Sequence, residues 1–387
     1  MLPIQAAGRI PLIGFYALYF SITGIVLPFL PAYLKSLTLS VSQVGLLLSL
    51  SPLLALGAPH FWGHLADRTG RPHRVLSVIC SGACLAFIPL LFVDRFPTLV
   101  ASLAAYAFFA SSITPLIDSL ALQHVAQTGG SYSHLRLFGS LGFVLSSTLF
   151  GLAVDSVGRA TVLAAFSLLA TLTLWSFTLR DSGGPPAKVP VHPLAGLQLL
   201  ADRELRWLLA ACALHWIACA PYHGTFSIFV GSLGLPPSVV GISMGIGVTA
   251  ELGVMLLYPR VAARISPRDL LAIAFIASTL RWAGLSLTSS PAVIVALSLF
   301  HGLSFGAFYV ASIAFVARRV PPHLRASGQG LFAAITFGVG GLVGYSSAGA
   351  GYDWLGGHRL FAAAAVLELA AAALVLRITP REPRLPA

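Results

Sequence analysis

The stretch TPLIDSLALQHVAQTGGSYSHLRLFGSLGF, from Thr114 to Phe143, places two charged residues inside apolar segments. Asp118 lies in the first segment and Arg136 in the second, and a short run rich in Gly, Ser and Gln separates them. An ionised side chain inside a bilayer costs about 2.5–3.5 kcal/mol on insertion scales, so it persists where it pairs or lines a polar cavity. If these segments cross a membrane, the acid and the base mark a candidate functional site.

The composition of the 387-residue chain predicts an integral membrane protein. Hydrophobic residues make up 57% of the chain and charged residues only 9%, and the mean hydropathy is +0.88. A soluble domain usually carries about 25% charged residues. Apolar stretches long enough to cross a bilayer core of about 30 Å as helices recur along the chain, and the alternation typical of strands is absent.

We expect twelve spans, and the first is expected to be a retained helix because no small-residue cleavage site follows it. The predicted spans are residues 10–33, 43–63, 75–93, 96–125, 131–154, 159–179, 205–230, 238–259, 269–289, 291–317, 326–350 and 355–377.

The net charge of +11 is distributed unevenly over the predicted loops. With the N-terminus inside, most Lys and Arg residues fall on the cytoplasmic side, as in the cluster Arg68, Arg71 and Arg74, and few fall outside: Lys35, Arg95, Arg159 and Arg359. This asymmetry follows the positive-inside rule and predicts that both termini are cytoplasmic. A nucleic-acid partner is not needed to explain the positive charge.

A segment rich in Pro, Gly and charge divides the chain into two halves. We predict an N-terminal six-helix bundle at 1–180, a central cytoplasmic loop at 181–204 and a C-terminal six-helix bundle at 205–387. The halves also resemble each other, because residues 149–166 are similar to residues 347–364. Asp155 and Asp353 end corresponding spans, and Gly158 and Gly356 follow at the same distance, as expected of duplicated transporter halves.

The second half carries further polar residues within its predicted spans: His215, His223, Glu251, Arg281 and His301. Such a set, with Asp118 and Arg136, favours charges around a shared aqueous cavity, although structural ion pairs that only fix helix packing are the alternative. His223 and Tyr309 belong to faces that mix polar and aromatic side chains, which is typical of small-molecule sites. His215 is as compatible with a bond to a neighbouring helix, and Glu368 is expected to serve packing or an interface.

The four cysteines are expected to pack as small apolar residues within spans three and seven. We expect no histidine or acid at ligand spacing beside Cys80, Cys84, Cys212 or Cys219, and therefore no metal site. Phosphate loops, nucleophile elbows and His-Glu metal helices are absent from the sequence, so an enzyme is not predicted.

The loop GHLADRTGRPHR (63–74) resembles the motif between the second and third helices of the major facilitator superfamily, and the likeness extends over most of the chain. The resemblance implies two six-helix bundles that alternate between inward and outward openings. It also implies a role in holding one conformation closed for the motif residues, which here are Gly63, Asp67, Arg68, Gly70 and Arg71.

Within that superfamily, TPLIDSLAL and LRLFGSLGF resemble the branch that contains phenylpropionate-type permeases and lactose permease. The resemblance implies that Asp118 and Arg136 bind the solute. It also implies that Glu251, Arg281 and His301 couple proton movement to solute movement. Two positions depart from lactose permease: Ser304 stands where that permease has its proton-carrying carboxylate, and Phe143 replaces its sugar-stacking tryptophan. Proton coupling is therefore expected to rest on Glu251, Asp118 or His301.

The sequence therefore predicts an all-α, multi-pass protein of the inner (plasma) membrane that carries a small organic solute by proton symport. Asp118 and Arg136 would bind the polar part of the solute, with His223 nearby, and Phe20, Phe143 and Tyr309 would contact its apolar part. An aromatic or other organic acid is favoured over a sugar. The alternatives are proton-driven efflux of drugs or sugars and a non-transporting membrane sensor or receptor. We expect a monomer that uses the proton gradient and no bound cofactor.

Overall fold

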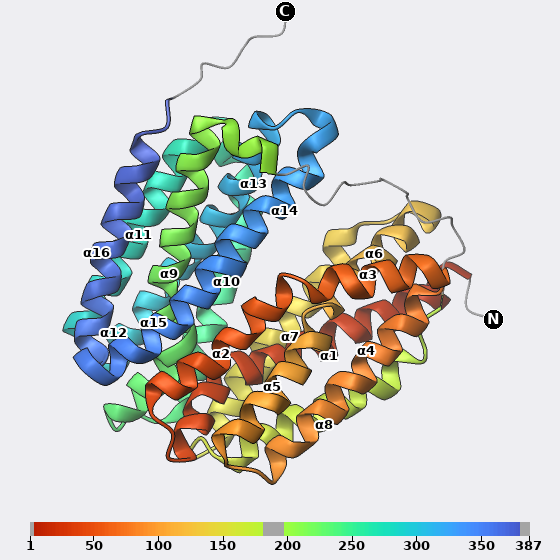
Figure 1. Ribbon diagram of the computed structural model, residues 1–387, viewed down its shortest axis with the longest axis horizontal. Coiled ribbons are helices and arrows are strands. Elements are labelled where there is room, and N and C mark those ends of the chain that lie inside the picture. Colours follow the sequence, from red (N-terminus) through yellow and green to blue (C-terminus); the bar gives the residue numbers. More distant parts are fainter. Residues whose placement is uncertain (1–3, 181–196, 380–387) are drawn as a thin grey trace, which may run out of the picture. The chain divides into compact units, whose positions relative to one another are not determined.

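The computed structural model describes residues 4–180 and 197–379, and the ordered elements in these ranges are all helical. The first eight long helices are α1 (Ile4–Ser36), α2 (Val41–Ala55), α3 (Ala58–Thr69), α4 (Pro72–Phe87), α5 (Phe96–Ala110), α6 (Ile113–Thr128), α7 (Tyr132–Ala153) and α8 (Arg159–Ser176) (Figure 1).

The later helices are α9 (Arg203–Ser232), α10 (Pro237–Ala262), α11 (Pro267–Leu287), α12 (Pro291–Leu297), α13 (Phe308–Arg319), α14 (Arg325–Ala333), α15 (Gly340–Leu355) and α16 (Gly357–Leu376). Short 3-10 turns cover Ile88–Leu91, Leu197–Ala201, Ser298–Phe300 and Pro322–Leu324, and π-helical turns cover Gly302–Ala307 and Ala334–Val339.

Eleven helical segments of the described chain are long and apolar enough to cross a membrane. Several join two elements, as in Val41–Thr69, Phe96–Thr128 and Pro291–Arg319. Each coincides with a predicted span to within several residues. The predicted span 205–230 is formed by α9, which is 30 residues long but falls outside the eleven because its histidines and Pro221 lower its hydropathy. The predicted twelve-helix membrane fold is confirmed.

By contacts, the described chain divides into two compact units. The first unit contains the described residues of 1–188, 222–245 and 345–354, and the second contains those of 189–221, 246–344 and 355–387. Residues 181–196 of the predicted central loop lie outside the described ranges. The predicted bundle boundaries rest on composition and on the sequence repeat, and they stay a prediction.

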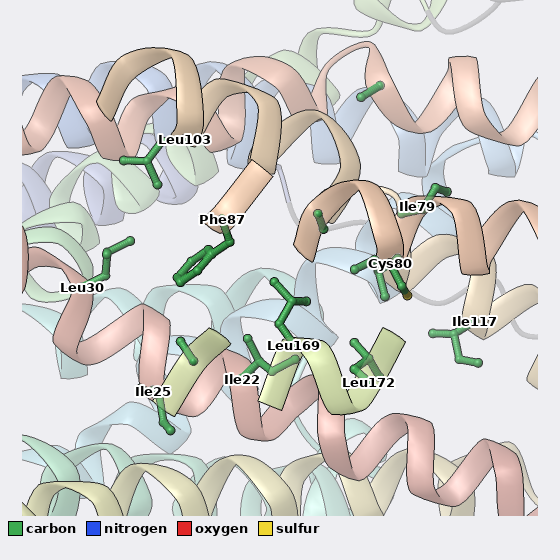
Figure 2. Packing of buried hydrophobic residues seen from close by; sticks show 14 of the residues in the cluster. Ile22, Ile25, Leu30, Ile79, Cys80, Phe87, Leu103, Ile117, Leu169 and Leu172 are labelled. Carbon is green, nitrogen blue, oxygen red and sulfur yellow. The ribbon is translucent and has the colours of Figure 1, made fainter. Parts of the chain in front are cut away.

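The core of the first unit forms around α1. This helix packs against α7 and α8, and α4 packs against α5 and α8. Apolar side chains from five helices meet there, including Ile22, Phe87, Leu103, Ile117 and Leu169 (Figure 2). All five are at most 5% exposed, so their burial removes most of their apolar surface from lipid or water. This packing fixes the parts of α1, α6 and α7 that carry the site described below.

The core of the second unit forms around α11, which packs against α16 and α13. Leu271 and Phe275 of α11 are fully buried with Ala311 of α13 and with Ala371 and Val375 of α16. The alanines allow α16 to approach closely, which is the usual way in which helices associate in lipid. The polar residues of α9, α11 and α16 therefore face a tightly packed interior.

The sequence repeat appears in the structure as two equivalent close helix crossings within the first unit. A Cβ atom at Gly349 of α15 would lie 2.9 Å from the Cα atom of Gly45 in α2. A Cβ atom at Gly151 of α7, the repeat equivalent of Gly349, would lie 3.1 Å from the Cα atom of Gly241 in α10. Larger residues would overlap backbone atoms at both crossings, so glycine is required there for a packing reason.

Asp353 strengthens one of these crossings. Its carboxylate accepts hydrogen bonds from the N–H groups of Val41 (3.1 Å) and Ser42 (2.7 Å) and from the Ser42 hydroxyl (2.6 Å). These N–H groups belong to the first turn of α2, where the helix dipole favours a negative charge. The end of α15 is therefore fixed to the start of α2.

The loop predicted to hold one conformation is partly helical. Helix α3 continues to Thr69, and Gly70 ends it with a φ of 62° and with its N–H bonded to the Ala66 carbonyl. Asp67 and Arg71 are exposed, and Asp67 neither caps α4 nor pairs with an arginine among the described residues. The conformational role of Gly63, Asp67, Arg68, Gly70 and Arg71 stays a prediction.

Candidate functional site

In the first unit, Asp118 is held by an aromatic residue of α1. The Tyr16 hydroxyl donates a hydrogen bond of 2.6 Å to Oδ1 of Asp118 on α6, and Tyr16 itself is fully buried. Tyr132, in the first turn of α7, also lies near Asp118 and Tyr16. A carboxylate placed in a membrane span is thus oriented by phenol groups.

Arg136 on α7 lies against the aromatic face of α1. Its guanidinium carbon is 4.0 Å from the centre of the Phe20 ring and 5.8 Å from that of the Tyr16 ring, which are favourable cation–π distances. Gly139 makes room for this arrangement, because a Cβ atom there would lie 2.7 Å from the Phe20 ring and 3.3 Å from a nitrogen of Arg136.

The two charged residues of the opening stretch are brought to the same aromatic face but not into contact. None of the ion pairs among the described residues joins Asp118 to Arg136. Both side chains are partly accessible. The structure therefore replaces a direct charge pair with a carboxylate bonded to Tyr16 and a guanidinium seated on Phe20.

The other predicted solute contacts of the first unit lie elsewhere on its helices. Phe143 of α7 is only 7% exposed, and its backbone packs so closely on α1 that a Cβ at Gly24 would lie 2.7 Å from its carbonyl oxygen. His223 of α9 is half-buried beside Tyr222, with ring centres 5.8 Å apart. The role of Phe143 and His223 in solute binding stays a prediction.

In the second unit, Arg281, His301 and Glu251 form a connected row. Nη1 of Arg281 lies 3.2 Å from Nδ1 of His301 and 3.1 Å from Oγ of Ser304. Nε2 of His301 lies 3.8 Å from a carboxylate oxygen of Glu251. The structure thus brings together the three residues predicted to couple proton movement, and Ser304, which replaces a carboxylate of lactose permease, accepts a bond from the arginine.

The hydrogen-bond roles determine the protonation of His301. A guanidinium can only donate, so Nδ1 of His301 accepts from Arg281 and carries no proton. The proton of the neutral ring is then on Nε2, which faces Glu251. A second proton on the ring would face the guanidinium, so the carboxylate of Glu251 is the group of this row best placed to bind a proton.

A π-helical turn positions this row. In Gly302–Ala307, the small residues Gly302 and Gly306 lie against α10, where a Cβ at Gly302 would meet the Ala250 carbonyl at 2.7 Å. The rings of His301, Phe305 and Tyr309 stack in parallel along the turn, with centres 5.6 and 6.1 Å apart. Tyr309, a predicted solute contact, is 37% exposed at the end of this stack. Such π turns are frequent at functional sites.

A second polar cluster in this unit corrects two expectations. His215 lies four residues before Cys219 on α9, and its Nδ1 is 2.9 Å from Oε2 of Glu368 on α16. Trp282 donates a bond of 3.0 Å to Oε1 of Glu368, and the Cys219 thiol points to the same oxygen at 3.8 Å. Glu368 is therefore the centre of a network rather than an isolated packing residue, and the expectation of no histidine or acid beside the cysteines was wrong.

His215, Cys219 and Glu368 place their donor atoms within 4.8 Å of one another, close enough to consider a metal ion. The contacts present are hydrogen bonds between the protein's own groups: Nδ1 of His215 is bonded to Glu368, and Nε2 is bonded to the Ser304 carbonyl at 3.0 Å. The expectation that this protein binds no metal or cofactor stays a prediction.

Two of these contacts carried a signal in the sequence. Tyr16 belongs to the aromatic face of the first span, and the hydroxyl of a tyrosine on such a face can bond to a buried acid. His215 and Cys219 are four residues apart, the spacing that places two side chains on one face of a helix. The partnership with Glu368, 153 positions away from His215, had no local signal.

Comparison with known proteins identifies the family. Residues 10–363 match the model of the MFS_1 like family. The chain is 28% identical over 379 residues to a probable 3-phenylpropionic acid transporter of Escherichia coli, covering 95% of this chain and 97% of that protein. It is also 28% identical to a maltose permease of Geobacillus stearothermophilus, covering 84% and 83%, and to the uncharacterized transporter YwbF of Bacillus subtilis, covering 95% and 93%.

Solved structures agree on the fold. A mutant of the nucleoside transporter NupG superposes with a TM-score of 0.89 at 17% identity, covering 96% of this chain and all of that one. A bacterial homologue of the human lysosomal transporter Spinster superposes with a TM-score of 0.78 at 14% identity, covering 97% of each chain. The resemblance to the major facilitator superfamily is confirmed, and with it the predictions of a transporter rather than an enzyme and of a multi-pass protein of the inner membrane. The chain belongs to the MFS_1 like family of membrane transporters of small solutes.

Proposed function

We propose that this transporter carries a small organic acid with an aromatic or other apolar part, and that it does so by proton symport. The observation that supports the solute class is the position of Arg136. Its guanidinium lies on the Phe20 ring and forms no ion pair among the described residues, while Asp118 is bonded to Tyr16. A carboxylate of the solute would supply the anion for Arg136, and its apolar part would lie along Phe20.

The named relatives are compatible with this chemistry. A 3-phenylpropionic acid carries a carboxylate and an aromatic ring, which are the two groups that Arg136 and Phe20 would receive. A maltose permease is equally similar in sequence identity, so sugars belong among the solutes to be tested. Phe143, His223 and Tyr309 are further proposed solute contacts.

Proton coupling is proposed for the row of Glu251, His301 and Arg281. Arg281 keeps Nδ1 of His301 unprotonated, so Glu251 is the residue proposed to bind the transported proton. The negative solute and the proton would then enter together.

The test uses the purified protein in liposomes that contain a pH-sensitive dye. We expect 3-phenylpropionate to drive proton uptake and the neutral amide of the same acid to drive none, because the amide lacks the anion for Arg136. Glu251→Gln should keep exchange of solute between the two sides and lose accumulation driven by a pH gradient. If uptake of every acid, sugar and nucleoside tested is indifferent to the gradient, the symport proposal is wrong. Proton-driven expulsion of the solute would instead indicate efflux.

The remaining expectations are a monomer, cytoplasmic termini and no nucleic-acid partner. We propose all three for this transporter.

A further inference from the structure

The pair of His215 and Glu368 is not used by the proposed solute site or by the row of Glu251, His301 and Arg281. Both side chains are completely buried, at 0% exposure, in the second unit. Aromatic rings close the site: His215 stacks on Phe275 at 4.6 Å between ring centres and lies 4.3 Å from Phe308. Burying an acid and a base costs free energy, so such residues are retained where they pair or serve a function.

The hydrogen bonds determine how many protons the pair holds. The Ser304 carbonyl only accepts, so Nε2 of His215 carries a proton. Trp282 only donates, so Oε1 of Glu368 accepts. The remaining contact, of 2.9 Å between Nδ1 of His215 and Oε2 of Glu368, needs one proton more. That proton makes either an imidazolium beside a carboxylate or a neutral ring beside a carboxylic acid, and the net charge of the pair is zero in both cases.

Loss of this proton would leave a net charge of −1 and two acceptors 2.9 Å apart. Two facing lone pairs repel, and a buried charge without a partner is costly. The deprotonated pair would therefore separate Nδ1 on α9 from Oε2 on α16. The proton thus holds α9 and α16 together. Because neither side chain has exposed surface, the proton exchanges with water only when these helices separate.

Ser304 connects this pair to the proposed coupling row. Its carbonyl accepts from His215, and its hydroxyl accepts from Arg281, so one residue of the π-helical turn Gly302–Ala307 contacts both. Among the described residues, the titratable or charged groups that face the pair are Cys219 on α9 and Arg281 on α11, and its other neighbours are Trp282, Phe275, Phe308 and Ser304.

We propose that His215 and Glu368 form a second proton-binding site, whose occupied state holds α9 to α16 and is sensed through Ser304 at the row of Arg281, His301 and Glu251. In its consequence for transport this inference rests on the proposed function. The binding of a proton by His215 and Glu368 does not rest on the proposed function, because the pair can be titrated in the absence of a solute.

The first experiment measures the proton directly. Infrared difference spectra of the purified, solute-free protein between acidic and alkaline pH should contain a component that disappears in Glu368→Gln and also in His215→Gln. Gln at 368 resembles the protonated acid, since its amide can donate to Nδ1 and accept from Trp282, so the variant is expected to fold. If the wild type and both variants give the same spectra, the pair never titrates and the proposal is overturned.

A further variant keeps the test decisive if Glu368→Gln or His215→Gln fails to fold. Trp282→Phe removes a hydrogen bond to Oε1, which stabilises the carboxylate, but leaves the proton in place. The midpoint of the same component should change, because Oε1 of Glu368 loses its donor. An unchanged midpoint would contradict the proposal, and so would a stoichiometric metal ion in the purified wild type.

The transport measurement separates the two proposals. Glu368→Gln should retain solute exchange and lose gradient-driven accumulation, because its site is permanently in the proton-occupied form. Normal accumulation in this variant would overturn the proposed link between the second site and transport while leaving symport intact. If the wild type itself shows no proton-linked transport, the proposed function fails, and the infrared titration still decides whether the pair binds a proton.

Discussion

Tyr16 controls the position of the only acid found near the proposed solute site in the described part of the first unit. Its hydroxyl is 2.6 Å from Asp118, while its ring lies beneath Arg136. Tyr16→Phe removes the hydroxyl and keeps the ring. A hydrogen bond to a charged group contributes about 1.5–3 kcal/mol, so loss of the group that orients Asp118 should raise the dissociation constant of the solute by at most roughly 100-fold. Equilibrium binding to the purified protein measures this change.

The matched control is Tyr33→Phe. That hydroxyl donates to the Leu90 carbonyl at 2.8 Å within the core and touches neither charged residue. We expect Tyr33→Phe to lower the melting temperature and to leave solute affinity unchanged. Equal affinities for the wild type and Tyr16→Phe would mean that Asp118 is oriented by other groups.

At the residue scale, the cost of burying charge identified Asp118, Arg136, Glu251 and Arg281 from the sequence alone. The same principle should have singled out Glu368, but its partner His215 lies far away in the chain and only tertiary packing brings them together. Nor does sequence show whether two opposite charges in neighbouring spans touch. Asp118 and Arg136 have separate partners on a third helix, α1: Asp118 is bonded to Tyr16, and Arg136 lies on the Phe20 ring.

At the element scale, Asp202 ties the start of α9 to the end of α13. Its Oδ1 accepts from the N–H groups of Glu204 and Leu205, at 2.9 and 3.0 Å, and Arg319 donates two bonds to the carboxylate, at 2.7 and 3.0 Å. Burial alone would raise the pKa of Asp202, but the bonds from Arg319 and from these N–H groups hold the pKa below its ordinary value.

This lowered pKa predicts the sign of a pH effect on stability. The stabilisation is complete above the pKa of the unfolded chain, about 3.9, and is lost as the pH falls through the lower pKa of the folded state. Asp202→Asn should cost about 1 kcal/mol near neutral pH, because Asn can still cap α9 but loses the negative charge that Arg319 binds. The difference in melting temperature from the wild type should begin to shrink below about pH 4 and should vanish once the pH has fallen through the lower pKa of Asp202 in the folded state.

The exposed Asp94 offers the control for this experiment. Asp94→Asn should leave the melting temperature unchanged at every pH. A difference between Asp202→Asn and the wild type that persists undiminished to the lowest pH would show that Arg319 does not act through the carboxylate charge.

Helix positions were predictable because the length of an apolar stretch is set by the bilayer and can be read locally. Helix α9 departs from the apolar pattern because His215, Pro221 and His223 serve tertiary contacts rather than lipid. The π-helical turns at Gly302–Ala307 and Ala334–Val339 were not predictable, since an extra residue in a turn depends on how neighbouring helices pack.

At the scale of the whole molecule, the sequence repeat was predicted because glycines and acids recur at equal distances in the two predicted halves. Gly151 and Gly349 make equivalent crossings with Gly241 and Gly45. Sequence does not show how contacts divide the chain: residues 222–245 and 345–354 group with the first unit, since glycine crossings and the Asp353 cap bind them there.

The charge distribution leads to a prediction of topology that full-length protein can test. With both termini cytoplasmic, Ser156 between α7 and α8 faces outside and Gln127 at the end of α6 faces inside, and both are exposed. A membrane-impermeant maleimide applied to intact cells should therefore label Ser156→Cys and not Gln127→Cys, whereas a permeant maleimide should label both. The native thiols are buried or half-buried, so wild type measures the background. The reverse pattern would place the arginine-rich loops outside, against the positive-inside rule, and would reverse the direction assigned to proton-driven uptake.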